Sequence, residues 1–235
     1  MRSTNAVEAT DVLSGAVSRL ALRQQNLNVL MPVLMHDVNG SLNGLALSTE
    51  LLSRLQQRDA ADPASAANLL LRTKNELSRL KLALKALENR VLPGVSGQLP
   101  ARMAPLVATM QEAQAVLMPA VRRGQHELRI ALRTDEVLLD LRAEDLFDVV
   151  AGLAIVAIEG APPHAVFDAV VESTPSEAIL TIEHAGTPRA VMAVEMHREL
   201  LRAAVRHSGG LVEWHQSGAG SRGRLQLPRV PASRS

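Results

Sequence analysis

A helical seam runs through residues 31–52, which read Met31-Pro-Val-Leu-Met-His-Asp-Val-Asn-Gly-Ser-Leu-Asn-Gly-Leu-Ala-Leu-Ser-Thr-Glu-Leu-Leu52. Apolar side chains recur there every seven residues, at Met31, Val38, Leu45 and Leu52, with Leu34 and Leu55 three positions beyond the first and the last. That spacing predicts a helix packed in a bundle. With Met31 at seam position a, His36 falls at position f, which points away from the core. We therefore expect the imidazole to face water.

The expected surroundings of His36 are small and polar. Asn39, Gly40 and Asn43 lie on the same outward face of the helix. A ring surrounded by short side chains can be approached closely by another molecule. An ordinary surface histidine is the alternative interpretation of His36 when it is taken alone.

Composition narrows the class of protein. The chain has 235 residues, of which 47% are apolar and only 1% aromatic, and its formal net charge is +1. So few aromatic side chains leave no stacking platform for single-stranded nucleic acid, and the balanced charge gives no field that attracts a polyanion. The lack of cysteine excludes disulfides, thiol catalysis and thiolate metal sites. No apolar segment is long enough for a signal peptide or a membrane span, so we expect a cytoplasmic protein that binds neither nucleic acid nor membrane.

Two long helices are expected in the first part of the chain. The first covers residues 11–58 and is interrupted or kinked near Pro32, because proline removes a backbone hydrogen bond. The second runs from Pro63 to about Val91 and carries leucines at seven-residue spacing, at Leu70, Leu77 and Leu84. Two antiparallel helices cannot cover both apolar seams by themselves. A second copy of the chain would cover them, which predicts a homodimeric four-helix bundle.

The pattern changes after residues 92–100, which form a linker rich in glycine and proline. Helices are expected near residues 103–121, 145–159 and 190–207, and short strands near 127–132, 137–141, 166–172, 178–183, 211–215 and 222–227. Strands and helices mingled in this order predict an α+β sandwich, with helices on one face of a mixed sheet.

This order of elements resembles the transmitter region of a sensor histidine kinase, over roughly residues 11–228. His36-Asp-Val-Asn-Gly-Ser-Leu42 is similar to the H-box of that family, although Ser41 replaces the usual proline. Residues 146–158 fall on the N-box helix of the GHKL (Bergerat) fold, and Thr181-Ile-Glu-His-Ala-Gly186 falls on the strand before its first glycine box. The resemblance implies a dimerisation and phosphotransfer hairpin at residues 8–92 and a catalytic-type α/β sandwich at residues 101–228.

The resemblance fails at the nucleotide site. The family has asparagines where this chain has Gly152 and Val156, and a valine offers Mg²⁺ no oxygen ligand. Where the family has the aspartate that binds adenine, this chain has His184. The first glycine box keeps its first glycine at Gly186, but its second glycine is replaced by Pro188. The segment between Gly186 and the next helix leaves no room for an ATP lid. We expect the fold to be kept, with neither a cofactor nor a metal ion of its own.

A phosphorylatable histidine attached to a kinase fold without an ATP site resembles the ChpT-type histidine phosphotransferases, dimeric proteins that relay phosphoryl groups between receiver domains. The resemblance implies that His36 is the phosphoacceptor and that Asp37 orients the ring or accepts its proton. It implies response-regulator receivers and a hybrid histidine kinase as partners, with Mg²⁺ supplied by the receiver. The receiver would land on Asn39, Gly40, Asn43 and Leu47. Contact with the second domain would explain an exposed Leu47 equally well.

Other functions stay open on the sequence alone. An autophosphorylating histidine kinase with an unusual ATP site is one, and Val156 and His184 argue against it. A non-catalytic pseudo-kinase that sequesters receivers is another, and the intact pair of His36 and Asp37 argues against it. A phosphatase is the weakest alternative, because the family's water-positioning residue falls at Gly40. The expected activity is therefore phosphotransfer rather than ATP-dependent phosphorylation.

Overall fold

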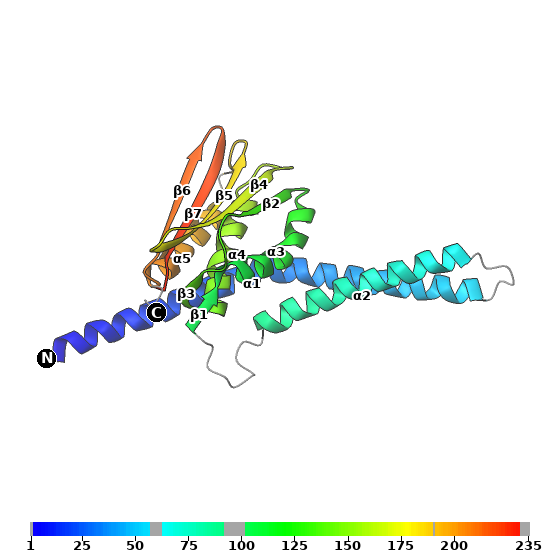
Figure 1. Ribbon diagram of the computed structural model, residues 1–235, viewed down its shortest axis with the longest axis horizontal. Coiled ribbons are helices and arrows are strands. Elements are labelled where there is room, and N and C mark those ends of the chain that lie inside the picture. The colour runs from blue at the N-terminus through cyan, green and yellow to red at the C-terminus, as the bar shows by residue number, and fades with distance from the viewer. Residues whose placement is uncertain (1, 57–62, 92–101, 190, 231–235) are drawn as a thin grey trace. The chain divides into compact units, whose positions relative to one another are not determined.

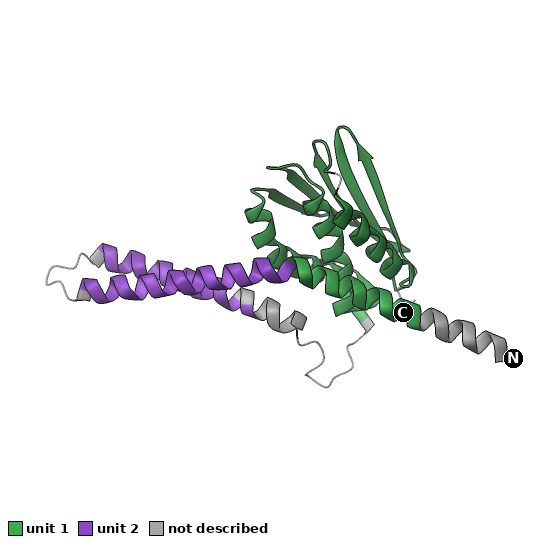
Figure 2. Ribbon diagram, turned by 180° about the vertical axis from the view of Figure 1, so that it is seen from behind, with its two compact units in different colours: residues 1–29, 97–235 green, residues 30–96 purple. Residues whose placement is uncertain are grey.

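The computed structural model describes residues 2–56, 63–91, 102–189 and 191–230 (Figure 1). The turn expected at residues 58–62 and the linker expected at residues 92–100 lie outside these ranges. The chain divides into two compact units, one formed by residues 1–29 and 97–235 and the other by residues 30–96 (Figure 2). We call them the α/β unit and the hairpin unit. The expected fold class, an α+β chain with a helical hairpin followed by an α/β sandwich, is confirmed.

Apart from β1 (Arg102–Pro105), the helices and strands follow the order expected from the sequence. None of the helices that the structure describes combines the length and the apolar character that crossing a membrane requires. In chain order the elements are α1 (Arg2–Gln56), α2 (Pro63–Val91), β1 (Arg102–Pro105), α3 (Leu106–Arg123), β2 (Glu127–Leu132), β3 (Leu138–Arg142), α4 (Ala143–Glu159), β4 (Val166–Ser173), β5 (Glu177–Ala185), α5 (Met192–Arg206), β6 (Leu211–Ser217) and β7 (Gly220–Pro228).

The hairpin unit contains the second half of α1 together with α2. The expected seam of α1 is confirmed, because its a and d positions are buried or half-buried. The seam also includes serine at two d positions, Ser41 and Ser48, which an apolar pattern does not count. Small residues let the two helices approach each other: a Cβ on Gly44 would lie only 3.3 Å from Glu76 Cγ of α2.

The first half of α1 belongs to the α/β unit and not to the hairpin. The division between the units therefore falls between residues 29 and 30, inside one continuous helix. The sequence placed residues 8–29 in the hairpin domain, because the helical pattern continues through them without a break. Leu22 and Asn26 are the physical reason for the difference, since both are buried against helices of the α/β unit.

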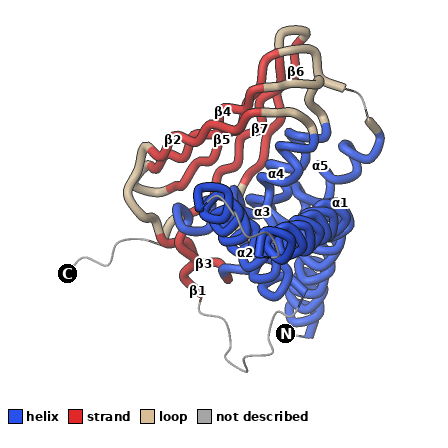
Figure 3. Tube along the Cα trace, turned by 90° about the vertical axis from the view of Figure 1, so that its right-hand side faces the viewer, coloured by secondary structure: helices blue, strands red, loops and turns tan. Residues whose placement is uncertain are grey.

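A five-stranded sheet forms one layer of the α/β unit, in the order β2-β4-β5-β7-β6, and α3, α4 and α5 cover one of its faces (Figure 3). β2 pairs with β4 in parallel, and the remaining pairs are antiparallel. Side chains alternate between the faces, so that Phe167 and Leu180 are buried under the helices while Asp168 and Arg222 face solvent. The mixed sheet expected from the sequence is therefore present.

A separate two-stranded sheet pairs β1 with β3 in antiparallel fashion, and the sequence did not predict β1. A helix was expected from residue 103, whereas α3 begins at Leu106. The first turn of α3 is capped from a distance, because the N–H groups of Val107 and Ala108 donate to the carboxylate of Glu136 at 2.8 and 3.1 Å. A cap and a strand partner so far along the chain leave no local sequence signal.

Candidate functional site

His36 lies on the outward face of α1 in the hairpin unit, as the seam predicts. Its side chain is exposed, and so are Asn39, Gly40 and Asn43 beside it. A Cβ on Gly40 would meet no heavy atom within 4 Å. The imidazole therefore stands next to open space, into which another molecule can bring a reacting group.

The outward face continues for several turns beyond His36. Steps of three and four residues connect it to further exposed positions as far as Arg54. At 1.5 Å of rise per residue the surface is about 27 Å long, close to the diameter of a small domain. Leu47, an apolar side chain within it, is 48% exposed, and Glu50 pairs with Arg54 at the far end, at 2.5 Å. We call this surface the His36 strip: His36, Gly40, Asn43, Leu47, Glu50 and Arg54.

Asp37 is half-buried, one position around the helix from His36. Consecutive residues of an α-helix are turned about 100° apart, so neighbouring side chains do not face each other. Within the part of the chain that the structure describes, no hydrogen bond joins the Asp37 carboxylate to the His36 ring. The orienting or proton-accepting role of Asp37 stays a prediction.

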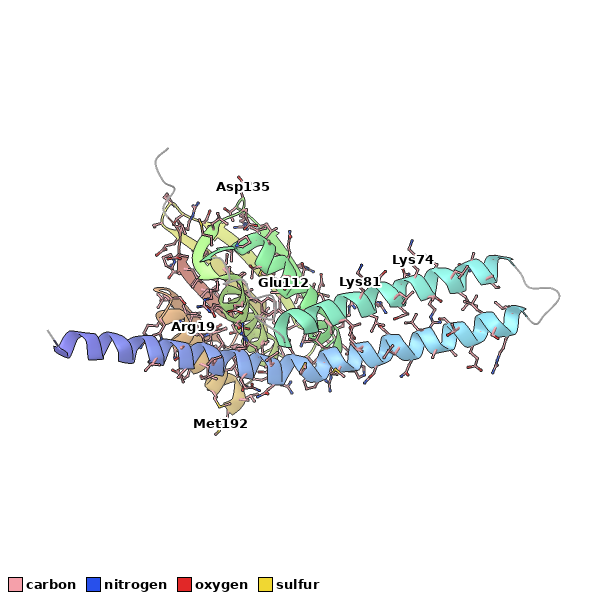
Figure 4. All side chains as sticks on the ribbon, turned by 90° about the horizontal axis from the view of Figure 1, so that it is seen from below. Arg19, Lys74, Lys81, Glu112, Asp135 and Met192 are labelled. Atoms are coloured by element: carbon pink, nitrogen blue, oxygen red, sulfur yellow. The ribbon has the colours of Figure 1, made fainter. Side chains whose placement is uncertain are left out.

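Helix α2 carries an exposed apolar row beside its half-buried side. Leu70, Leu77 and Leu84 are 58, 52 and 50% exposed, although they recur at the seven-residue spacing of a packed seam. Lys74 and Lys81 project from one side of α2, where solvent can reach them (Figure 4). About half of each leucine side chain is therefore in contact with water in the single chain.

In the α/β unit, the nucleotide face that the resemblance places on α4 is covered by α1. Residues 146–157 of α4 are all buried, so no side of the helix is open to solvent along that length. A Cβ on Gly152 would lie 3.2 Å from Leu22 Cδ1 and 3.4 Å from Asn26 Oδ1, both of α1. Val156, one turn further along, is fully buried. The missing side chain at Gly152 is what lets α1 lie so close to α4.

Polar contacts hold α1 in this position. Arg23 Nε donates to Asp148 Oδ2 at 2.9 Å, and Asn26 Nδ2 donates to the Asp148 carbonyl oxygen at 2.8 Å. Asn26 Oδ1 accepts from His197 Nε2 of α5 at 2.8 Å. Burial lowers the pKa of His197 to about 4, so its ring is neutral near pH 7 and donates through the Nε2 hydrogen. We call Arg23, Asn26, Asp148 and His197 the α1 clasp.

The acidic first turn of α4 adds charge to these contacts. Glu144 lies 3.2 Å from a guanidinium nitrogen of Arg23, and Asp145 lies 3.9 Å from Arg19, which is labelled on α1 in Figure 4. Carboxylates at a helix N-terminus are also favoured by the helix dipole. Partly exposed pairs of this kind contribute about 1 kcal/mol or less each, so they orient α1 more than they hold it.

The other positions of the expected nucleotide site follow one another at the end of β5. His184 is buried, and its ring packs edge-on against Phe167 with 5.5 Å between the ring centroids. Gly186 has a φ of +94°, and a Cβ there would lie 2.9 Å from Pro162. Pro188 comes next, and α5 begins at residue 192, so the connection is short, as the sequence predicts. Among the described residues, no group of three or more His, Asp or Glu side chains is arranged to hold a metal ion.

The α1 clasp was missed by sequence reasoning. Asn26 and His197 are polar, and a polar side chain in a helical pattern is assigned to the solvent face. A complementary charge pattern could have indicated the contact, because two basic residues one turn apart on α1 match an acidic first turn on α4. The residues that carry this pattern are Arg19 and Arg23 on α1 and Glu144 and Asp145 in the first turn of α4, with Asp148 about one turn further along.

The chain has counterparts among solved structures, whereas no protein-family model and no curated protein sequence matches it. The catalytic domain of histidine kinase ThkA is similar over 55% of this chain and 97% of that domain, with 12% identity and a TM-score of 0.49. Histidine kinase AdeS of Acinetobacter baumannii is similar over 86% of this chain and 96% of that one, with 13% identity and a TM-score of 0.47. A bacterial phosphotransferase is similar over 88% of this chain and 96% of its own chain, with 12% identity and a TM-score of 0.49. Similarity at this level carries no statement about the activity of this chain.

Proposed function

We propose that this protein is a phosphorelay histidine phosphotransferase. It takes a phosphoryl group from the aspartyl phosphate of one response-regulator receiver domain onto His36 and passes it to the aspartate of another. The observation that carries the proposal is the open His36 strip, in which an exposed imidazole stands beside the empty space over Gly40. A transfer protein of this kind needs a positioned nucleophile on a rigid element and a surface on which the donor can land.

In the proposed transfer, the lone pair of an imidazole nitrogen of His36 attacks the phosphorus atom. The N–P bond forms while the P–O bond to the receiver's aspartate breaks, and the electron pair of that bond leaves with the aspartate carboxylate. The ring then loses its remaining N–H proton to water or to the neighbouring Asp37. Mg²⁺ held by the receiver's own carboxylates neutralises the phosphoryl oxygens, so this chain need not supply a metal ligand.

The α/β unit is proposed to work without ATP. The complete burial of residues 146–157 supports this, as does the contact of Gly152 with Leu22 and Asn26. A nucleotide on that face would have to displace α1, which would break the α1 clasp and return Leu22 to water. The energy of that displacement counts against binding.

The working form is proposed to be a homodimer that closes a four-helix bundle. The exposed row of α2 supports it, together with Met35 and Leu42 of α1, which are 44 and 47% exposed. A second hairpin would remove these side chains from water, at about 25 cal/mol per Å² of apolar surface. Leu77→Glu combined with Leu84→Glu should give monomers in sedimentation at micromolar concentration. A wild-type monomer throughout that range would contradict the dimer.

The test of function is transfer from receiver domains encoded by the same genome, each carrying ³²P on its aspartate. The wild-type chain should gain acid-labile, base-stable label, and His36→Gln should gain none while its free energy of unfolding stays within about 0.5 kcal/mol of wild type. His215→Gln, which also changes an exposed histidine, is the matched control and should accept label normally. Label on His36→Gln would refute the assignment. A wild type that binds receivers tightly and never gains label would identify a sequestering pseudo-kinase instead.

A further inference from the structure

The first half of α1 carries a stripe of exposed apolar side chains. Leu13, Val17 and Leu20 are 67, 65 and 63% exposed. They follow one another at steps of four and three residues, so they share one face of the helix. Three large aliphatic side chains left in water on one face indicate a contact surface rather than scattered surface residues.

The α/β unit to which this half of α1 belongs cannot cover the stripe, because it holds the opposite face. A Cβ on Gly15 would lie 2.9 Å from the ring of His207 at the end of α5. Leu22 is buried, and Asn26 is hydrogen-bonded to both α4 and α5. The helix is therefore fixed by one face and presents the other to solvent.

The stripe continues the heptad seam of the hairpin toward the N-terminus. Counting back from Met31 at position a, Leu13, Leu20 and Leu27 occupy position d, and Val17 and Gln24 occupy position a. A β-branched residue at a with leucine at d favours two parallel strands, and one polar residue at an a position fixes register. The same seam is buried or half-buried from residue 31 onward and exposed at Leu13, Val17 and Leu20.

The positions that flank the seam are compatible with a symmetric contact. Ser14, Ala16 and Ala21 carry no charge. Arg23 is charged, but it is already engaged with Glu144 and Asp148 of its own unit. Two identical helices can therefore approach along this face without like charges facing each other, which is the usual obstacle to an isologous contact.

We infer that residues 13–27 of α1 form a parallel, in-register, two-stranded coiled coil with the same residues of a second copy of this chain. The inference rests on the homodimer of the proposed function and gives it an interface outside the hairpin. Because α1 is clasped to α4 and α5, the coil ties each α/β unit to the dimer axis through its own helix. The dimer would then be held by two successive contacts along the same helix.

Cysteine cross-linking tests the inference cleanly, because the chain has no cysteine of its own. Leu20→Cys places a thiol at a d position, within the Cα separation that a disulfide spans in a parallel coil. Ser18→Cys, two residues away at position b, is the matched control. Mild oxidation should link Leu20→Cys into a covalent dimer and leave Ser18→Cys unlinked. A second measurement uses Leu13→Glu combined with Leu20→Glu, which should weaken the dimer about tenfold or more in sedimentation.

The outcomes separate this inference from the proposed function. A dimer in sedimentation that Leu20→Cys does not cross-link would overturn the coil and leave the bundle standing. Equal cross-linking of both cysteine variants would indicate random collision and would also overturn it. A wild-type monomer would overturn the coil and the bundle together. Phosphotransfer to His36, assayed on the same variants, decides the proposed function independently, since neither Leu20 nor Ser18 belongs to the His36 strip.

Discussion

Heptad position f of α1 is occupied by Leu22 in the first half of the helix and by His36 in the second, and the two side chains have opposite environments. Leu22 is 1% exposed and lies against Gly152 of α4. His36 is exposed, and the space beside it at Gly40 is empty. The backbone is the same α-helix in both halves. The neighbouring elements, and not the geometry of the helix, therefore decide whether this face of α1 is buried or open to solvent.

The two halves should therefore respond differently to substitution. In the covered half, each buried side chain contributes to the free energy of folding, and none is accessible to a partner. In the open half, the exposed side chains contribute little to folding, and the proposed transfer would depend on them. Variants on one helix can thus lose stability without losing transfer, or lose transfer without losing stability.

Gly40→Arg should have the largest effect, and it should fall on transfer alone. The long side chain would fill the space beside His36, and misplacing a reacting group by even about 1 Å costs roughly 100-fold in rate. We expect phosphotransfer to fall by about 100-fold or more, measured from single-turnover label transfer. Gly218→Arg is the matched control, because a Cβ there also meets nothing within 4 Å. Undiminished transfer in Gly40→Arg would mean that the receiver docks elsewhere.

Leu22→Ala should lower the free energy of unfolding by about 3 kcal/mol, since it leaves a cavity between α1 and α4. Urea denaturation followed by circular dichroism measures the change. Met192→Ala, at a side chain that is 89% exposed, should change it by less than about 0.5 kcal/mol. Transfer by the folded Leu22→Ala protein should be close to normal. A loss below about 1 kcal/mol would show that α1 is not held against α4.

Acid should weaken the α1 clasp through His197. Its pKa is about 4 in the folded chain and near 6.5 when unfolded. The folded state therefore binds fewer protons between these values, and stability falls as the pH drops from about 6.5 to about 4. The loss reaches about 3 kcal/mol at most. His197→Gln should be less stable at pH 7 and should lack this part of the pH dependence.

The control for this experiment is the difference between wild type and variant at each pH. Burial raises the pKa of Asp145 and of Glu159, and these carboxyls stabilise the fold on acidification, in the opposite direction. Both proteins contain them, so their contribution cancels in the difference. Parallel stability curves for the two proteins from pH 7 to pH 4 would contradict the role of His197.

Gly152→Asn should have the smallest effect, a destabilisation of about 1–3 kcal/mol from overpacking against Leu22 and Leu201. It introduces the residue type that histidine kinases carry at the position resembling Gly152, yet α1 still covers the face. Calorimetric titration with Mg-ATP should stay flat for the variant, as for wild type. Gly152→Ala, which adds only a Cβ, should be destabilised less. A micromolar ATP isotherm in Gly152→Asn would mean that the face is open.

The seam and the open histidine were predictable from sequence because both depend on local helical spacing. Positions 31–55 of α1 show the expected burial, and His36, Asn39, Gly40, Asn43 and Leu47 are exposed as expected. The strands of the sheet were predictable for the same reason, because apolar and polar side chains alternate along them. The helical period of three to four residues and the strand period of two can both be read from a continuous stretch of sequence, without knowing which distant segments pack against it.

The covered half of α1 was not predictable in this way. Asn26 is buried because its amide satisfies Asp148 and His197, which lie 122 and 171 residues away along the chain. The short strand β1 exists because it pairs with β3, and the cap of α3 comes from Glu136. Each of these depends on a contact between distant segments, which a single sequence does not display. The role of Asp37 and the docking role of the His36 strip stay predictions.

The most direct test compares two phosphoryl donors on the same wild-type protein. The chain is incubated with γ-labelled Mg-ATP alone and, in a separate reaction, with a receiver domain that carries labelled phosphate on its aspartate. Acid-labile phosphate at His36 is then measured by peptide mapping. A covered α4 and an open His36 strip predict label from the receiver and none from ATP. Label from ATP alone would contradict this, because α1 would then have to leave Gly152 and let a nucleotide bind.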